Sequence, residues 1–109
     1  MLAVVLQSLD ENKAVDVLEI DLIGKTSLAD FMVIANGTSQ RHVSSLAHFL
    51  IREIKKSGFK APNIEGLPRA DWVLVDAGDI IIHIFRPEVR SFYNLEKMWL
   101  VDLNDDMSL

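Results

Sequence analysis

Glu19 and Asp21 are two carboxylates whose spacing could support catalysis. Residues two apart on an extended strand project from the same side, and such a pair can hold a metal ion for phosphoryl or nucleotidyl transfer. The stretch 37–39, Gly-Thr-Ser, precedes an expected helix, whose unpaired N–H groups could receive a phosphate. A nucleotidyltransferase-like enzyme therefore stays open as an alternative. However, no Gly-Ser motif is followed by an Asp-x-Asp pair at the distance such enzymes use.

Other catalytic patterns are incomplete in this sequence. Gly24-Lys25-Thr26 has the ending of a phosphate-binding P-loop, but position 19, where that loop needs a glycine, is a glutamate. No G-x-S-x-G elbow for a serine nucleophile occurs, and the chain has no cysteine to act as a nucleophile or a thiolate ligand. These motifs therefore predict no catalytic residues.

The three histidines do not have the spacing of a metal site. His42 and His48 are six residues apart on one expected helix, so their side chains point to different sides. His83 alternates with Ile81 and Phe85 on an expected strand, which is typical of a packed residue rather than a ligand. The sequence therefore predicts neither a metal nor a cofactor.

The segment 70–85, ADWVLVDAGDIIIHIF, has the most distinctive local composition in the chain. Asp76 and Asp79 could act as a paired acid and base, but they flank a turn, where aspartate is favoured for local hydrogen bonds. Between residues 62 and 79, four acidic residues and one basic residue accompany Trp72. A tryptophan among carboxylates is typical of a docking surface, because the ring supplies buried area and the charge orients the partner. The other interpretation places Trp72 in the core beneath the first helix.

The bulk composition is that of one compact globular domain, which we expect over residues 1–101, followed by an acidic tail at 102–109 that frays. Sixteen acidic and eleven basic residues give a net charge of −5, and the Lys and Arg positions are spread along the chain. This charge disfavours direct RNA or DNA binding and favours a basic protein partner. Without cysteines, a signal peptide or a membrane-spanning stretch, a cytoplasmic protein is expected.

Apolar periodicity predicts the elements that position these residues. Helices are expected over 2–14, from Thr38 or Ser39 to Gly58, and from Pro87 onward. Strands are expected over 16–23, which ends in a turn at Gly24-Lys25, and over 29–37, 72–77 and 79–86. The loop-like stretch 60–71 could add a short edge strand at 63–66. The predicted fold class is therefore α+β, a mixed β-sheet packed against helices in the order α-β-β-α-β-β-α.

Three motifs in this sequence resemble those of the ribosomal silencing factor family, also called Iojap-like proteins. They are GTSQRHV at 37–43, DWVLVDAGD at 71–79 and FYNLEKMW at 92–99, and the resemblance extends over about residues 9–99. It implies a nucleotidyltransferase-like fold that lacks the catalytic residues of those enzymes. It also implies a homodimer-forming, non-enzymatic factor.

The resemblance further implies a partner, the large ribosomal subunit, bound through one of its basic proteins on the face where the small subunit docks. Binding there would block association of the subunits and repress translation when nutrients are short, with no sequence-specific nucleic acid binding and no membrane. For the partner-binding surface, we predict Trp72 as the anchor, surrounded by Asp71, Asp76 and His83. Tyr93 and Glu96 from the last helix are the remaining predicted contacts.

Overall fold

The computed structural model of the chain describes residues 1–93, with side chains described through Arg90. The elements are α1 (Leu2–Glu11), β1 (Val15–Asp21), β2 (Phe31–Asn36), α2 (Gln40–Lys56), β3 (Asn63–Glu65), β4 (Trp72–Asp76), β5 (Ile80–Phe85) and α3 (Pro87–Tyr93). Within this part of the chain, no helix is long and apolar enough to span a membrane. The predicted tail at 102–109 lies outside the described residues.

A five-stranded mixed sheet organises the fold, with strand order β1-β2-β5-β4-β3. The central pair, β2 and β5, runs parallel, and each of the other neighbouring pairs is antiparallel. This architecture confirms the predicted α+β class, with β3 as the short edge strand that the sequence allowed. The nucleotidyltransferase-like character of the fold stays a prediction.

Two predicted boundaries extend too far. The helix expected to reach residue 14 ends at Glu11, because Lys13 adopts a left-handed conformation with φ of 65° that a helix cannot continue. The first strand ends at Asp21, whose Oδ1 accepts a hydrogen bond from the backbone N–H of Ile23 at 2.9 Å and so begins a turn.

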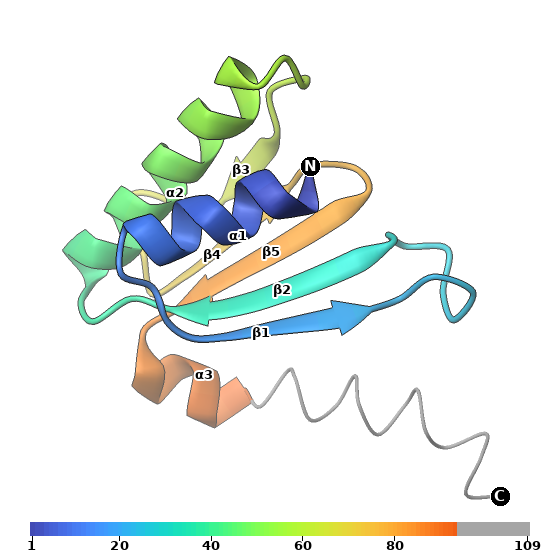
Figure 1. Cartoon of the computed structure of the whole chain (residues 1–109). Coiled ribbons are helices and arrows are strands. Elements are labelled where there is room, and N and C mark those ends of the chain that lie inside the picture. Colours follow the sequence, from blue (N-terminus) through green and yellow to red (C-terminus); the bar gives the residue numbers. More distant parts are fainter. Residues whose placement is uncertain (94–109) are drawn as a thin grey trace, which may run out of the picture.

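Helices α1 and α2 cover one face of the sheet (Figure 1). The predicted apolar stripe of α2 is fully confirmed, because Val43, Leu46, Ala47, Leu50 and Ile54 are all buried. They pack with α1 and with inward-facing residues of the central strands into the larger of two apolar clusters. Burying a Leu- or Ile-sized side chain contributes about 1.5–3 kcal/mol, so this stripe fixes the helix on the sheet.

The opposite face of the sheet is formed by alternate residues of β1, β2, β4 and β5. Among the described elements, only α3 lies on this side (Figure 1). Arg90 ties α3 to the sheet: its Nη1 donates to the backbone carbonyl of Asp16 at 2.6 Å and to Asn36 Oδ1 at 3.1 Å. Asp16 lies where the β1–β2 pairing is irregular, and its φ of 51° belongs to that irregularity.

Candidate functional site

The candidate site is a surface on the sheet face opposite α1 and α2, which we call the Trp72 face. The strand register pairs Trp72 with Phe85, Leu74 with His83, and Asp76 with Ile81, so these six side chains share one side of β4 and β5. Trp72 is half-buried and belongs to the smaller apolar cluster around Phe85. It therefore does not pack beneath the first helix, which lies on the other face.

Three rings form the centre of the Trp72 face. The Trp72 ring stacks on Phe85 with centroids 5.1 Å apart and an interplanar angle of 25°, and it lies tilted against His83 at 5.8 Å. Trp72 Nε1 donates a hydrogen bond to His83 Nδ1 at 3.0 Å. His83 therefore carries its proton on Nε2. Only 8% of the His83 surface is exposed, so His83 offers a partner little direct contact. Its role on this face is to hold the Trp72 indole in place through the hydrogen bond.

Acid is expected to weaken the protein through His83. Burial lowers the pKa of His83 to about 4, from an ordinary value of 6.5. Between these two pH values the unfolded chain binds a proton that the folded chain does not, so the free energy of unfolding falls as the pH falls. The total loss by pH 4 is about 3 kcal/mol. Urea titrations at pH 7, 6, 5 and 4 measure it.

The variant His83→Asn isolates this effect, because Asn can place an acceptor near the position of Nδ1 and does not titrate. Loss of ring packing lowers the stability of the variant by an amount independent of pH. We expect the difference in unfolding free energy between wild type and variant to shrink by about 3 kcal/mol from pH 7 to pH 4. A constant difference would show that His83 is not the titrating group.

Asp71 organises the loop before β4 rather than presenting a free charge. Arg69 Nε donates to its Oδ2 at 2.6 Å, Gln40 Nε2 donates to its Oδ1 at 2.9 Å, and Arg86 Nε lies 2.8 Å from Oδ1. The hydrogen bond from Arg69, followed by that from Gln40, lowers the pKa of Asp71. The surroundings of Trp72 on this side therefore contain two guanidinium groups as well as the predicted carboxylate.

A hollow of about 560 Å³ opens beside Trp72. Leu67, Trp72 and Val89 supply its apolar lining, and Arg69 and Arg86 supply guanidinium groups. A hollow of this kind can receive an apolar side chain of a partner, with polar groups at its margin to orient it. Its position next to the stacked rings extends the candidate surface from β4 towards α3.

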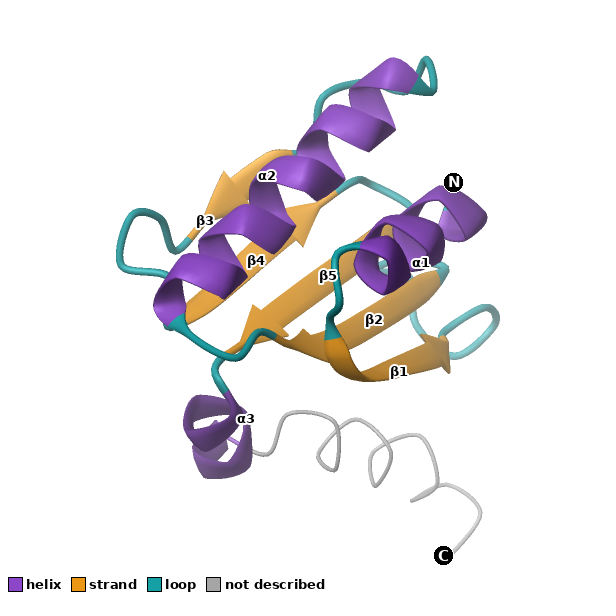
Figure 2. Cartoon of the chain, turned by 60° about the vertical axis from the view of Figure 1, so that its left-hand side comes forward, coloured by secondary structure: helices purple, strands orange, loops and turns teal. Residues whose placement is uncertain are grey.

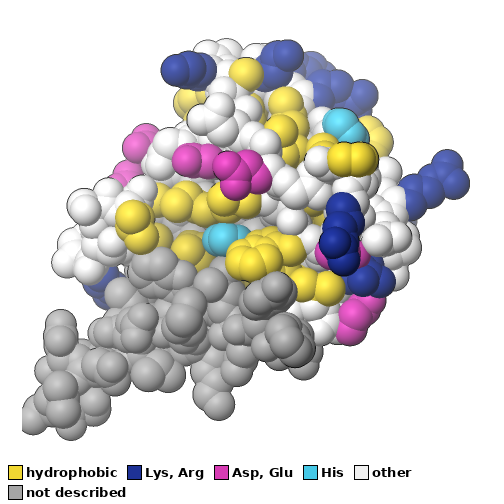
Figure 3. Space-filling view, turned by 180° about the vertical axis from the view of Figure 1, so that it is seen from behind, with side chains coloured by type: hydrophobic (Ala, Val, Ile, Leu, Met, Phe, Trp, Pro, Cys, Tyr) yellow, Lys and Arg dark blue, Asp and Glu magenta, His cyan; other side chains and the backbone are white. Residues whose placement is uncertain are grey.

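Asp76 lies on the Trp72 face but four residues along β4 from Trp72, a separation of about 13 Å. Glu65 of β3 pairs with Leu74 and so projects on the same side. Both acidic side chains are exposed. Figure 3 shows acidic side chains above an apolar band that includes a histidine, so the negative charge forms a margin on one side of the face.

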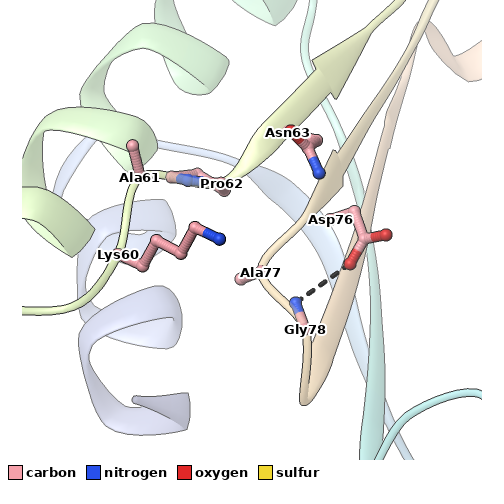
Figure 4. Close-up of a pocket in the computed structure, with 7 residues that line it drawn as sticks. All are labelled: Lys60, Ala61, Pro62, Asn63, Asp76, Ala77 and Gly78. Atoms are coloured by element: carbon pink, nitrogen blue, oxygen red, sulfur yellow. Dashed lines mark hydrogen bonds between the residues drawn. The ribbon is translucent and has the colours of Figure 1, made fainter.

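A second hollow, of about 270 Å³, lies at the turn between β4 and β5. Figure 4 shows Lys60 extending towards this turn, while the Asp76 carboxylate points away from Lys60 and accepts the hydrogen bond of the Gly78 N–H at 2.9 Å. The carboxylate thus supports the turn, as expected for aspartate at this position. Asp79, the other half of the considered acid–base pair, accepts backbone hydrogen bonds from Asp30 and Phe31 through its carbonyl.

The last two predicted contact residues are only partly covered by the structure. Tyr93 is the final residue of α3, which places it on the same side of the sheet as Trp72, but its side chain is not described. Glu96 lies outside the described residues. Both stay predictions.

The residues of the enzymatic alternative are not brought together. Glu19 pairs with Val33, which is four residues before Gly37, so the carboxylates lie about 13 Å or more from the start of α2. Ser39 Oγ already accepts the His42 N–H at 3.1 Å, and His42 Nδ1 accepts the Thr38 N–H at 2.9 Å. The groups proposed to hold a phosphate are therefore used within the chain.

The 37–43 motif instead connects β2 to α2 and ties α2 to the end of α1. The other ring nitrogen of His42, Nε2, lies 2.9 Å from the carbonyl of Asn12 after α1 and donates to it, because Nδ1 is the acceptor. At Gly37, a Cβ would lie 2.8 Å from the backbone nitrogen of Val43, so only glycine permits this approach. Among the described residues, no three His, Asp or Glu side chains are grouped to hold a metal ion.

Sequence reasoning counted Arg69 and Glu65 among the charged residues near Trp72, but it did not predict the partners of Asp71 or the place of Glu65 on the Trp72 face. Arg86 directly follows β5, and Gln40 starts α2, so their approach to Asp71 depends on the pairing of distant strands. The place of Glu65 follows if the short strand at 63–65 pairs with β4, because Glu65 then lies opposite Leu74 and projects on the same side as Trp72. That step needs the β3–β4 register, which local composition does not give.

Comparison with known proteins identifies the family. A family model described as "Ribosomal silencing factor during starvation" matches residues 1–108. The chain belongs to this ribosomal silencing factor family. A relative from Zymomonas mobilis, named ribosomal silencing factor RsfS, is 58% identical over 99 residues, covering 91% of this chain and 74% of the relative.

A solved structure agrees with the fold, and a further relative is similar in sequence. A crystal structure of a Chromobacterium violaceum protein superimposes with a TM-score of 0.86 at 35% identity, covering 90% of this chain and 82% of the other. A mouse relative, named mitochondrial assembly of ribosomal large subunit protein 1, is 35% identical over 101 residues, covering 90% of this chain and 44% of the relative. The resemblance predicted from the three motifs is thus confirmed.

Proposed function

We propose that this chain represses translation by binding the large ribosomal subunit and blocking its association with the small subunit. Membership of the ribosomal silencing factor family supports a role at the ribosome, and the name of the mouse relative refers to the large ribosomal subunit. The structural observation that carries the proposal is the ring stack of the Trp72 face, which lies outside the helix-covered core. The mechanism is steric, so it needs no catalytic residue and no cofactor.

Trp72 is the proposed anchor of the contact. Interfaces concentrate binding energy in a few buried aromatic or Arg residues at their centre. Its indole is held by Phe85 and His83 before binding, so little side-chain entropy is lost when a partner covers it. The hollow beside it accepts an apolar side chain of the partner. The anchor and the hollow together provide the affinity.

Acidic side chains around Trp72 orient the partner in the same contact. The exposed Asp76 and Glu65 on the margin of the face attract a basic ribosomal protein, which is the proposed partner. Asp71 contributes by fixing the loop that leads into Trp72, and Tyr93 and Glu96 are proposed contacts from the C-terminal side. The net charge of −5 limits capture by ribosomal RNA elsewhere.

Three further properties belong to this proposal. The protein acts in the cytoplasm, where ribosomal subunits exchange. It forms a homodimer in the free state. One structural domain over residues 1–101 carries the activity, without sequence-specific nucleic acid binding and without membrane attachment.

Cosedimentation with purified ribosomal particles tests the proposed function. We expect the protein to pellet with free large subunits and not with small subunits or joined ribosomes, because the joined state covers the binding surface. Equal pelleting with small subunits would contradict the proposal. Metal-dependent nucleotide binding detected by calorimetry, without ribosome binding, would instead favour the enzymatic alternative with Glu19 and Asp21.

A further inference from the structure

Arg90 is a buried cation in the contact between α3 and the sheet. Only 9% of its surface is exposed. Its Nη1 donates to the carbonyl of Asp16 on β1 and to Asn36 Oδ1 on β2. Burying a guanidinium group is costly unless its N–H groups are hydrogen-bonded. The two acceptors on the sheet therefore fix where Arg90, and with it α3, can lie.

Both acceptors are unusual features of the sheet. The β1–β2 register gains one residue on β1 between Val15 and Leu18, and Asp16 lies in this bulge. A bulge leaves backbone groups of the extra residue outside the ladder, which makes the Asp16 carbonyl available to Arg90. Asn36 is the last residue of β2 and is only 5% exposed, so its amide oxygen needs a donor within the protein. Arg90 satisfies both groups.

Val89, the neighbour of Arg90, forms part of the hollow beside Trp72. It lines that hollow from α3, while Leu67 lines it from the loop before β4. Successive residues of a helix project about 100° apart, so Arg90 reaches the strands while Val89 faces the hollow. Figure 2 shows that α3 follows the end of β5 and lies away from α1 and α2. The place of Val89 therefore depends on how α3 is attached to the sheet.

Two arginines attach α3 at different points. Arg86, directly before the helix, lies 2.8 Å from Asp71 Oδ1 and 2.7 Å from Glu88 Oε1, and so fixes the start of α3. Arg90 lies about one turn later and fixes the direction of the helix axis. Helices in proteins depend on tertiary contacts for most of their stability. Without the Arg90 hydrogen bonds, the axis of α3 can turn about its start and carry Val89 away from the hollow.

We propose that Arg90 is a positioning residue for docking on the large ribosomal subunit, because it holds α3 where Val89 closes one side of the hollow. This inference rests on the proposed function, in which the hollow receives an apolar side chain of the partner. Arg90 itself offers a partner almost no surface. The proposed partner is basic, so the loss of a cation does not by itself weaken binding. Weaker binding of an Arg90 variant therefore reports the position of α3 and not its charge.

Substitutions of Arg90 test the inference through the affinity for isolated large subunits. Arg90→Met removes every N–H donor and keeps a flexible side chain that fills similar space, and we expect Kd to rise about tenfold. Arg90→Lys keeps one donor group and should lose only about threefold. Arg41→Met is the matched control, because it removes the same charge at an exposed position on α2, and it should stay within about twofold of wild type.

A double-mutant cycle with Val89 separates positioning from a general structural role. Val89→Ala alone is expected to weaken binding about threefold, since it removes part of the hollow lining. In the Arg90→Met background the same change should add almost nothing, because Val89 has already moved. Losses that add fully would show that Arg90 acts independently of the hollow, and would overturn the inference.

Hydrogen exchange of the free protein tests the attachment of α3 without the ribosome. In Arg90→Met, we expect faster exchange at residues 87–93 and unchanged protection in α2 and the central strands. Faster exchange throughout the chain would make Arg90 a general stabilising residue and overturn the inference. If wild type and Arg90→Met bind large subunits equally well, the positioning role is refuted while docking through Trp72 stands. If wild type does not bind large subunits, the proposed function fails, and a positioning role in docking fails with it.

Discussion

Replacing Trp72 by alanine is expected to weaken binding to the free large subunit by about 100-fold. Truncation of a central aromatic anchor costs 2–4 kcal/mol in typical interfaces, which corresponds to between about 30-fold and 1,000-fold in Kd. The loss has two physical sources here. The partner loses contact with the indole surface, and the hollow proposed to receive its apolar side chain loses the wall that Trp72 forms. Affinity is measured by fluorescence titration with labelled subunits.

Two control variants separate docking from folding. Trp72→Phe keeps a ring that can stack on Phe85 and should lose less than about tenfold in affinity. Phe59→Ala removes another aromatic side chain, 40% exposed and outside the Trp72 face, and should leave binding unchanged. If Trp72→Ala has native circular dichroism and wild-type affinity, Trp72 is not the anchor.

Gly66→Ala is expected to cost about 3–4 kcal/mol of unfolding free energy, a large share of the 5–15 kcal/mol typical of a domain. Gly66 has φ of 100°, a region that side chains rarely adopt, and a Cβ there would overlap the backbone carbonyl of Trp72. That carbonyl cannot move easily. Trp72 pairs with Phe85 in the ladder, and the adjacent Asp71 carbonyl accepts a hydrogen bond from Arg86.

Gly58→Ala is the matched control for this prediction. Gly58 also has positive φ, at 90°, but no atom lies within 4 Å of the position of its Cβ. Only conformational strain applies there, about 1 kcal/mol. Urea unfolding should therefore give a markedly lower midpoint for Gly66→Ala than for Gly58→Ala, with similar slopes. Equal midpoints would mean that the loop before β4 yields easily and does not fix Trp72.

Much of the fold could be predicted because its elements have clear periodicity. The apolar stripe of α2 and a cap at Thr38 or Ser39 were legible in the sequence, since apolar residues at intervals of three and four and a hydroxyl before the first turn are local signals; the structure selects Ser39. The end of α1 was not legible, because a left-handed lysine at position 13 has no local signature. The β2–β5 parallel pairing also depends on contacts distant in sequence.

The candidate site was predictable in its centre and not in its surroundings. The alternation of Trp72, Leu74 and Asp76 follows from the two-residue period of a strand. The ion pairs of Asp71 and the position of α1 on the opposite face required the strand order. Without the strand order, the local sequence suggested a single acidic group around Trp72. In the fold, Asp71 is paired with Arg69 and Arg86, and the exposed carboxylates of Asp76 and Glu65 lie apart from it at the margin of the face.

Subunit joining, followed by light scattering after small subunits are mixed with large subunits, tests the steric mechanism most directly. If the large subunits are first saturated with this protein, the rise in scattering should be almost abolished, and the same concentration of Trp72→Ala should leave it nearly unchanged. Full joining while wild-type protein remains bound to the large subunit would contradict obstruction as the mode of action.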